Sequence, residues 1–432
     1  AEAAPASTKL ADTKPKASEY KFTMAVSPLD CMGCGECVTV CPTAAIEMKP
    51  QESQSEQQAA FDYCVENIRK KDNIPGVVSD ISVKGSQFNQ PLLEFSGSCA
   101  GCAETSYARL ITQLFGEKMF ISNATGCSSI WGGTASISPY TTNKESGHGP
   151  AWINSLFEDN AEHGLGMQIG YETVRANLIT KVEALKGKNA ELDAVIDKFL
   201  ETKNNTKAND EPAKALIAAL EACGCDESKE ILKDKQYLAK KSFWIFGGDG
   251  WAYDIGYGGL DHVLASGHDV NVMVFDTEMY SNTGGQASKA SNIGEVCQFA
   301  AAGKEISKKS LAEICMTYGY IYVAQIALGA NMNQAVKAIA EAEAYPGPSL
   351  IIGYAPCELH GVKGGMTNCQ NEMKKAVEAG YWNLFTFNPA NKAQGKNPFT
   401  LTSKAVDAEK YQALLANETR YSRLTRAFPE RA

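Results

Sequence analysis

The pattern of hydrophobic and polar residues changes about ninety residues into the chain. From about Leu92 onward, short apolar segments rich in β-branched and aromatic residues alternate with segments of helical periodicity. This alternation is typical of an α/β fold in which an open, mostly parallel sheet is covered by helices on both faces. The strands expected from it are residues 119–122, 243–246, 270–275, 320–327 and 349–354, and the helices are 106–115, 255–265 and 331–344.

Composition narrows the class of protein. A length of 432 residues with 44% hydrophobic content is enough for two or three domains with sizeable cores, which excludes a disordered or fibrous chain. The 41 basic and 50 acidic residues give a net charge of −9, so we expect no nucleic-acid partner bound through a general basic surface. No apolar run of ~18 residues and no signal-peptide pattern are present, so we expect a cytoplasmic protein without a membrane partner.

Fourteen cysteines are many for such a protein, and a reducing compartment favours metal ligation or catalysis over disulfides. Cys31, Cys34, Cys37 and Cys41 have the spacing C-x2-C-x2-C-x3-C and are followed by Pro42, which is the bacterial 4Fe–4S pattern; a zinc knuckle is the alternative. In a two-cluster ferredoxin the first three thiolates hold one cluster and the fourth points to the other. The sequence contains one copy of the motif, so we expect the rest of a longer polypeptide or a partner subunit to supply the second.

These observations divide the chain into segments. We expect a linker over residues 1–22, a partial 4Fe–4S ferredoxin-like α+β domain over 23–60, and a connecting segment over 61–91. The α/β domain then spans 92–432. Within it, the Lys-, Glu- and Ala-rich residues from about 171 to 241 have helical periodicity and are interpreted as a solvated helical insertion without a core of its own.

A glycine-rich turn marks a candidate cofactor site. The expected strand 243–246 runs into Gly247-Gly248-Asp249-Gly250, whose backbone amides can approach diphosphate oxygens, and Asp249 adds a carboxylate suited to Mg²⁺. The next strand ends in a polar loop that contains Thr277, 28 residues after Asp249. This arrangement resembles the thiamine-diphosphate motif, except that Thr277 stands where the motif has an Asn. A hydroxyl can still bind Mg²⁺, together with a backbone carbonyl near Met279.

A second cluster site can be assembled from the ends of strands. Cys99-x2-Cys102 lies in a glycine-interrupted loop before a helix, while Cys127 and Cys357 follow the expected strands 119–122 and 349–354. Because carboxyl ends of parallel strands meet at one edge of a sheet, one site built from these four cysteines beside Asp249 is geometrically plausible.

The other cysteines are interpreted differently. Cys64, Cys297, Cys315 and Cys369 are isolated in apolar or helical contexts and read as structural thiols. For Cys223-Gly224-Cys225 the choice between a structural pair and a redox pair stays open, and neither residue is assigned to the site. The five histidines have no metal-ligand spacing and receive no catalytic role.

Together these motifs resemble the C-terminal portion of the pyruvate:ferredoxin (flavodoxin) oxidoreductase family. The resemblance runs from about Met24 to Pro429. Its most specific stretches are LEFSGSCAGCAE from Leu93, NATGCSSIWGG from Asn123, IFGGDGWAYDIG from Ile245 and YSNTGGQ from Tyr280.

The resemblance implies roles for individual residues. It implies a 4Fe–4S cluster on Cys99, Cys102, Cys127 and Cys357, Mg²⁺ on Asp249, Thr277 and Met279, and a substrate-side, catalytic amide on Asn282. Residues implied to contact thiamine diphosphate are Glu104, Cys127, Gly248, Asp249, Gly250, Trp251, Thr277, Glu278, Met279, Tyr280, Ser281 and Asn282.

The implied activity is oxidative decarboxylation of pyruvate to acetyl-CoA and CO₂ through thiamine diphosphate. Coenzyme A takes the acetyl group, and single electrons pass through 4Fe–4S clusters to ferredoxin or flavodoxin, as in anaerobic metabolism. The other half of the thiamine site lies in an N-terminal portion in this family, so we expect the chain alone to be inactive and the full enzyme to be a homodimer. The alternatives are a non-redox thiamine enzyme and an electron-transfer iron–sulfur protein with a degenerate thiamine site.

Overall fold

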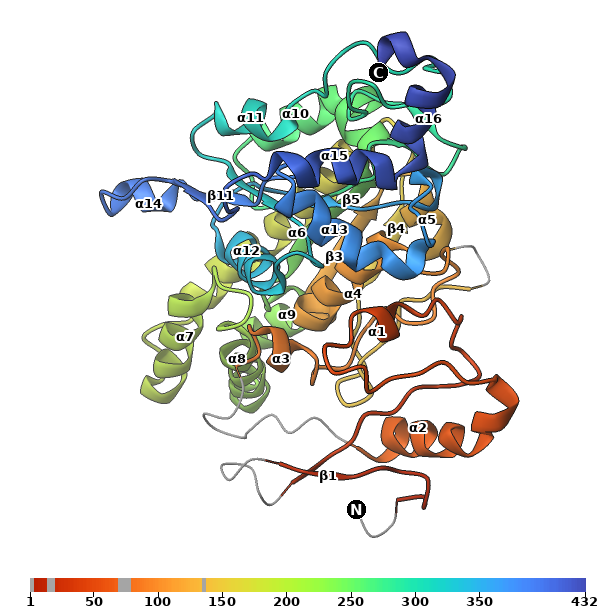
Figure 1. The fold of residues 1–432 in the computed structure, drawn as a ribbon. Helices are drawn as coiled ribbons and strands as arrows, with labels where there is room; N and C mark the ends of the chain where they lie inside the picture. The colour runs from red at the N-terminus through yellow and green to blue at the C-terminus, as the bar shows by residue number, and fades with distance from the viewer. Residues whose placement is uncertain (1–3, 14–19, 69–78, 134–136) are drawn as a thin grey trace.

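The computed structural model describes residues 4–13, 20–68, 79–133 and 137–432 (Figure 1). Within these ranges, eight strands form one sheet in the order β12-β11-β9-β10-β6-β5-β3-β4. The block from β9 to β4 is parallel, and β11 and β12 add an antiparallel edge. The strands are β3 Met119–Asn123, β4 Ala151–Asn154, β5 Ser242–Gly248, β6 Asn271–Asp276, β9 Tyr322–Ile326, β10 Ser349–Tyr354, β11 Phe385–Phe387 and β12 Phe399–Leu401.

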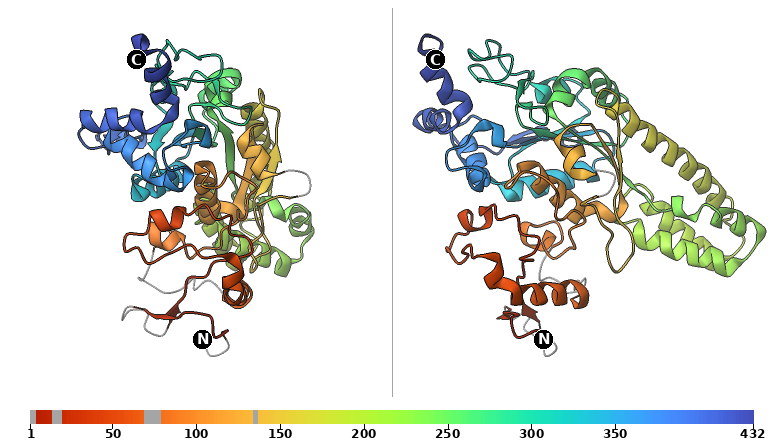
Figure 2. Two further views of the ribbon diagram at one scale, coloured as in Figure 1. Left: turned by 45° about the vertical axis from the view of Figure 1, so that its right-hand side comes forward. Right: turned by 90° about the vertical axis from the view of Figure 1, so that its right-hand side faces the viewer.

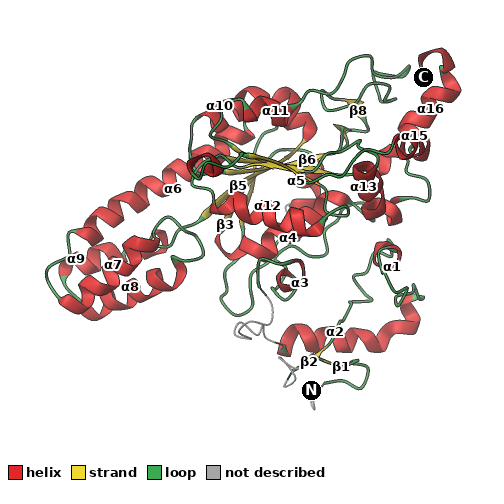
Figure 3. Ribbon diagram, turned by 60° about the vertical axis from the view of Figure 1, so that its left-hand side comes forward, coloured by secondary structure: helices red, strands yellow, loops and turns green. Residues whose placement is uncertain are grey.

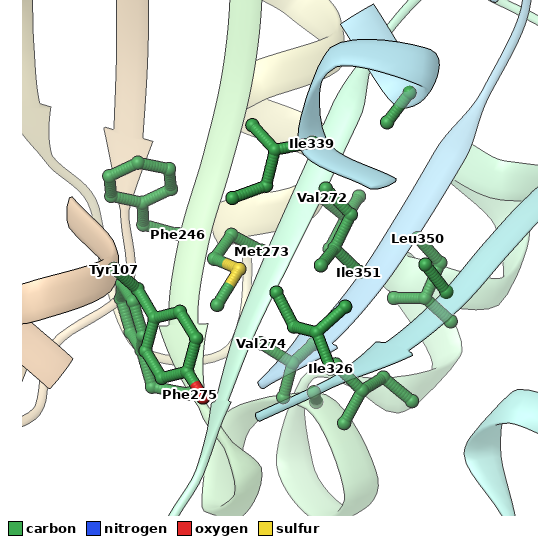
Figure 4. Close-up of a cluster of buried hydrophobic side chains, with 14 of the residues drawn as sticks. Tyr107, Phe246, Val272, Met273, Val274, Phe275, Ile326, Ile339, Leu350 and Ile351 are labelled. Atoms are coloured by element: carbon green, nitrogen blue, oxygen red, sulfur yellow. The ribbon is translucent and has the colours of Figure 1, made fainter. Parts of the chain in front are cut away.

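Helices cover both faces of this sheet, which confirms the expected α/β class. Figure 3 shows α10 (Tyr257–Ala265) and α11 (Leu311–Met316) on one face and α4 (Ala103–Phe115) and α12 (Met332–Ala344) on the other. The central strands are therefore buried on both sides and read as continuous apolar runs such as 272–275 and 350–352. Their side chains pack with Tyr107 and Ile339 from the covering helices (Figure 4).

The topology creates a crevice at one edge of the sheet. From β3 the chain moves outward to β4 and then returns to β5 on the other side of β3. Open parallel sheets bind ligands at such a switch point, outside the carboxyl ends of the strands. The pairing of Asn123 with Phe246, Gly248 with Phe275 and Asp276 with Tyr354 aligns the carboxyl ends of β3, β5, β6 and β10.

All five expected strands are present, with small shifts of their ends, whereas β4, β11 and β12 were not expected. β4 and β12 are the two edge strands and are largely exposed, so their sequences lack a strong apolar signal. β11 lies next to β12 and is only three residues long. The helix expected over 255–265 begins at Tyr257 because a π-helical turn, Gly250–Ile255, precedes it. The indole of Trp251 fills the space beside Gly247 and Gly256 in this turn.

The helical insertion projects from the sheet domain (Figure 2). It consists of α6 (Asn160–Glu183), α7 (Ala190–Thr202), α8 (Asp210–Cys223) and α9 (Asp226–Leu232). The expectation that it lacks a core is wrong: Leu178, Ile196, Phe199, Leu216 and others form a hydrophobic cluster separate from that of the sheet. The helix α6 leads into it from the sheet: Ala161 and Leu165 in its first part pack in the core of the sheet, and Leu178 farther along packs in the cluster of the insertion.

The N-terminal part of the chain has little regular structure. The expected linker contains a two-stranded ribbon, β1 (Ala11–Asp12) with β2 (Lys21–Phe22), and α2 (Ser55–Asn67) crosses the boundary expected at residue 60. The ferredoxin-like region holds the short α1 (Glu36–Thr39). Part of the expected linker and of the connecting segment lies outside the described residues.

In the part of the chain that the structure describes, no helix is long and apolar enough to cross a membrane. The remaining helices and strands are α3 Val83–Ser86, α5 Cys127–Gly132, β7 Met279–Tyr280, β8 Gln286–Ala287, α13 Cys369–Glu378, α14 Ala390–Ala393, α15 Ala408–Asn417 and α16 Thr419–Ala427.

Candidate cofactor and cluster sites

Three oxygen donors converge where β5 and β6 end. The Thr277 hydroxyl lies 2.9 Å from Asp249 Oδ1 and 2.9 Å from the carbonyl oxygen of Met279. Asp249 is fully buried, and its Oδ2 accepts a hydrogen bond of 2.6 Å from the Ser288 hydroxyl. A carboxylate, a hydroxyl and a carbonyl so close together match the hard-ligand chemistry of Mg²⁺.

An unusual backbone conformation brings two of these donors together. Glu278, between Thr277 and Met279, has φ +61°, in the left-handed region that a residue with a side chain rarely adopts. This turn directs the Thr277 hydroxyl and the Met279 carbonyl to the same point.

Buried ion pairs hold Glu278 in place. Its carboxylate lies 2.8 Å from Arg420 Nη1 and 3.0 Å from Lys308 Nζ, and it also accepts hydrogen bonds from Tyr381 and Asn292. Burial alone would raise the pKa of Glu278, but Lys308 and Arg420 outweigh it and lower the pKa to about 2. The carboxylate is thereby fully engaged, so any contact of Glu278 with a cofactor falls to its backbone.

The glycine turn leaves room for an anion. A Cβ on Gly248 would have no neighbour nearer than 3.9 Å, whereas a Cβ on Gly250 would lie 2.6 Å from the Tyr280 ring. Gly248 therefore exposes its backbone, and Gly250 lets Tyr280 pack over the turn. The Trp251 side chain is fully buried, so its share of a diphosphate site is limited to the backbone. Asn282 is exposed at the tip of the next loop.

The four cysteines expected at the strand ends, called here the sheet-edge cysteines (Cys99, Cys102, Cys127 and Cys357), are neighbours. Cys127 interacts electrostatically with Cys99 and Cys357, and Cys102 interacts with Cys127. Burial, together with Glu104, raises the pKa of Cys127 to about 12. Thiols with such a pKa stay protonated in the absence of a cation, so this site favours the thiolate form only when it is bound to a metal.

Three contacts join these cysteines to the cofactor loops. Cys127 Sγ lies 3.3 Å from the Ser281 hydroxyl. The buried His360 imidazole interacts through Nε2 with the carbonyl of Thr277 at 2.8 Å and through Nδ1 with the backbone amide of Cys357 at 3.4 Å. Burial lowers the pKa of His360 to about 3, so it is neutral, with Nδ1 as acceptor and Nε2–H as donor.

Glu104 lies in the first turn of α4, two residues after Cys102, and is buried. The Trp131 indole donates a hydrogen bond of 2.8 Å to its Oε2. Burial raises the pKa of Glu104 to about 7, against the effect of that hydrogen bond.

The ferredoxin-motif cysteines (Cys31, Cys34, Cys37 and Cys41) divide into three and one. Cys37 interacts electrostatically with Cys34 and Cys31. The sulfur of Cys41 instead accepts a hydrogen bond from the Ala45 amide at 3.3 Å and lies 3.7 Å from the Thr43 hydroxyl. The loop that carries the first three includes Gly33 and Gly35, both with positive φ.

One short segment, 366–370, lies between the two sets of cysteines. A Cβ on Gly101, in the Cys99 loop, would lie 2.6 Å from the carbonyl oxygen of Met366. On the other side the Thr39 hydroxyl of α1 donates a hydrogen bond of 2.6 Å to the Thr367 carbonyl. Cys369 interacts electrostatically with both Cys34 and Cys357, so the thiol expected to be an isolated core residue lies between the two sets.

Among the described residues, no three Cys, His, Asp or Glu side chains are close enough to share one metal ion. A mononuclear zinc site would require its four ligands around one atom. A four-iron cluster bonds each thiolate to a different iron, so its ligands lie farther apart than those of a single zinc ion.

Sequence reasoning missed the residues that support these sites: Ser288, Lys308, His360, Thr367 and Arg420. They belong to no spaced motif, and each reaches the site through a contact distant in sequence. The positive φ at Glu278 also has no sequence signal, because Glu is not a residue that favours it.

Comparison with protein families gives the class. Residues 232–352 match the model of the thiamine pyrophosphate enzyme C-terminal TPP-binding domain, and residues 24–47 match that of the 4Fe–4S binding domain. The chain thus combines a thiamine diphosphate-binding domain with an iron–sulfur motif. The first match contains Asp249, Thr277 and Met279, and the second contains the ferredoxin-motif cysteines.

Comparison with curated proteins gives homologues. The chain is 50% identical over 422 residues to a pyruvate-flavodoxin oxidoreductase of Klebsiella pneumoniae, which covers 96% of the chain and 36% of that protein. It is 51% identical to a pyruvate:ferredoxin oxidoreductase of Moorella thermoacetica, covering 96% and 36%, and 47% identical to a mitochondrial pyruvate dehydrogenase [NADP(+)] of Euglena gracilis, covering 95% and 23%. The chain is homologous to a C-terminal part of pyruvate-flavodoxin and pyruvate:ferredoxin oxidoreductases, and it spans about a third of the length of the first two relatives.

A solved structure was also found. A 2-oxoglutarate:ferredoxin oxidoreductase of Magnetococcus marinus gives a TM-score of 0.41 at 14% identity, covering 77% of this chain and 89% of that one. This likeness is too weak to add to the assignment.

Proposed function

We propose that the chain is the part of a pyruvate oxidoreductase that binds the diphosphate and metal of thiamine diphosphate and carries electrons away through 4Fe–4S clusters. The observation that carries this proposal is the convergence of Asp249, Thr277 and Met279 beside the sheet-edge cysteines. His360 contacts both Thr277 and Cys357, and Ser281 contacts Cys127. The homologues of the chain supply pyruvate as the substrate and ferredoxin or flavodoxin as the acceptor.

Each residue has a defined task in this proposal. Asp249, Thr277 and the Met279 carbonyl hold Mg²⁺, and the backbone from Gly248 to Trp251 receives the diphosphate oxygens. When bound, thiamine diphosphate supplies the carbanion chemistry that decarboxylates a 2-oxo acid.

Glu104 and Asn282 are assigned to the reacting end of the site. Glu104 can hold or release a proton near neutral pH, because its pKa lies at about 7. Asn282 lies on the exposed loop where a substrate can reach its amide.

Electrons are proposed to leave through the sheet-edge cysteines toward the ferredoxin-motif cysteines. Segment 366–370 contacts the loop of the first set and the helix of the second, which makes it the short route between the clusters. The proposal also includes coenzyme A as the acetyl acceptor and a homodimeric complete enzyme. It further includes a cytoplasmic location and a role in anaerobic metabolism.

The test uses the chain after anaerobic cluster reconstitution, alone and with the remaining portion of a full-length relative. We expect Mg²⁺-dependent binding of thiamine diphosphate by the chain, but reduction of a viologen dye by pyruvate only when the other portion is present. Pyruvate-dependent dye reduction by the isolated chain would contradict the division of the site. Absence of thiamine diphosphate binding to the reconstituted complex would contradict the cofactor assignment.

A further inference from the structure

The tip of the helical insertion carries two thiols that the cofactor and cluster sites do not use. Cys223 is the last residue of α8, and Cys225 directly precedes α9. Their sulfur atoms lie 3.2 Å apart, within the described residues of a region that has its own hydrophobic cluster.

The backbone between the thiols accounts for this contact. Gly224 has φ +61° and ends α8 in the left-handed conformation, with its N–H bonded to the Leu220 carbonyl. The reversal places Cys223 and Cys225 side by side, although they are only two residues apart. The contact between the two sulfur atoms therefore requires a glycine at position 224.

Polar neighbours favour an ionised sulfur at this position. The Ser228 hydroxyl lies 3.1 Å from Cys225 Sγ, and Lys188 interacts electrostatically with both thiols. Hydrogen bonds from Ser228 and from the Cys225 backbone lower the pKa of Cys223, whereas burial raises that of Cys315 to about 12. The pair thus differs in kind from the structural thiols of the core.

A reagent can reach the pair. Cys223 is exposed and Cys225 half-buried. An adjoining cavity of about 450 Å³ is lined by Lys188 and Glu227, which both interact with Cys225, and by apolar surface from Ala184 and Leu185. Lysines and acidic residues on its rim suit a small zwitterionic molecule.

We propose that Cys223 and Cys225 form a redox-active dithiol that exchanges with low-molecular-weight disulfides. The Cys223 thiolate attacks one sulfur of the disulfide RSSR, so that a Cys223–SR bond forms and RS⁻ leaves. The Cys225 thiolate then attacks Cys223 Sγ and expels the second RS⁻. Overall, two protein thiols become one disulfide, two electrons and two protons pass to RSSR, and two RSH are released.

This site acts apart from the cofactor site. Of the pair, Cys225 packs against the hydrophobic cluster of the insertion. The disulfide would close a ring of only three residues, which adds little loop-closure stabilisation. Oxidation should therefore change the chemistry of the tip without changing cluster content or thiamine diphosphate binding. The proposal stands on these contacts and does not depend on the proposed function.

The experiment equilibrates the reconstituted chain anaerobically with reduced and oxidised glutathione at increasing ratios, followed by acid quenching, alkylation and trypsin digestion. The tryptic peptide 215–229 contains both cysteines and no others. We expect it to lose two hydrogens at oxidising ratios and to regain them with dithiothreitol. In Cys225→Ser, which cannot resolve the mixed disulfide, the same peptide should instead carry one glutathionyl group on Cys223.

Two further variants test the mechanism. Ser228→Ala should slow the exchange several-fold near neutral pH and match the unchanged chain at high pH, where the thiol is ionised in both. Cys64→Ser, which removes an isolated thiol on α2, should leave the redox behaviour of peptide 215–229 unchanged. Full alkylation of Cys223 and Cys225 at every glutathione ratio, or disulfides formed only between chains, would overturn the proposal.

Discussion

The sheet-edge cysteines and the ferredoxin-motif cysteines reach their positions by opposite means. The sheet-edge cysteines come from three distant parts of the chain and are brought together by β3, β10 and α4, which pack in the core of the sheet domain. The ferredoxin-motif cysteines all lie within eleven consecutive residues, Cys31 to Cys41, and one glycine-rich loop groups them.

The surroundings of the two sets differ in the same way. Of the described residues 20–68, only Ser27 and Ala60 are buried, and Met24, Val26 and Leu29 are 60% or more exposed. The sheet-edge site is therefore shaped by the fold before any cluster binds. We expect the ferredoxin-like region to depend on its clusters and on further protein surface for its order, as small iron–sulfur domains without a core generally do.

The largest expected effect on stability comes from replacing Arg420, a buried cation of the sheet domain. Arg420→Met leaves Glu278, Glu295 and Glu418 buried without their shared cation. Removing one partner from a buried ionic network costs about 3–5 kcal/mol, so thermal unfolding of the sheet domain should shift down sharply. Arg426→Met, at the exposed end of α16, is the matched control and should unfold like the unchanged chain.

Asp249→Asn removes the only carboxylate of the metal trio while keeping an oxygen that can accept from Thr277. We expect Mg²⁺-dependent binding of thiamine diphosphate to weaken roughly a hundredfold, about 2.7 kcal/mol, in calorimetric titration. Asp197→Asn, on the exposed face of the insertion, should bind normally. Equal affinity in both variants would place the metal elsewhere.

A carboxyl group at the amino ends of β5 and β6, opposite the candidate cofactor site, should make the stability of the fold depend on pH. Glu343 on α12 is half-buried and accepts hydrogen bonds from Ser242 and Asn271, which begin β5 and β6. Burial raises the pKa of Glu343 to about 7 from 4.5, so its folded state retains a proton that the unfolded chain has lost. Its contribution is therefore complete below about pH 4.5 and is lost as the pH rises to about 7.

Glu343→Gln keeps a neutral side chain at every pH. We expect the variant to be more stable than the unchanged chain by about 2 kcal/mol above pH 7, with the difference shrinking toward low pH in denaturant titrations. Glu221→Gln, at the exposed end of α8, should retain the original slope. A Glu343→Gln curve parallel to that of the unchanged chain would refute the assignment.

The smallest expected effect concerns the contact between the two regions. Thr39→Val removes the hydrogen bond to the Thr367 carbonyl, worth about 1 kcal/mol, and should speed amide hydrogen exchange in residues 24–47 while β6 stays protected. Thr173→Val removes a hydroxyl that donates only to the Ile169 carbonyl within its own helix α6, and should alter neither region. Unchanged exchange in the Thr39 variant would mean that the ferredoxin-like region is held by other contacts.

The features of this molecule that could be predicted from sequence are those encoded in local sequence patterns. Runs such as 272–275 predict central strands, and the positions of Asp249, Thr277, Cys127 and Cys357 after strands predict a shared edge. Supports such as Arg420, Lys308 and His360 could not be predicted, because they act across long sequence separations without periodicity. The core of the insertion was missed because its many Lys and Glu residues suggest a solvated surface, although its apolar residues lie on facing helices.

The account is tested most directly by iron and sulfide analysis, with electron paramagnetic resonance, of the anaerobically reconstituted chain and of two variants. It predicts one cluster of about four irons per chain that Cys34→Ala retains and Cys127→Ala loses, because only the sheet-edge cysteines are brought together by the fold. Zinc bound in place of iron, or a cluster that survives Cys127→Ala and disappears in Cys34→Ala, would contradict it.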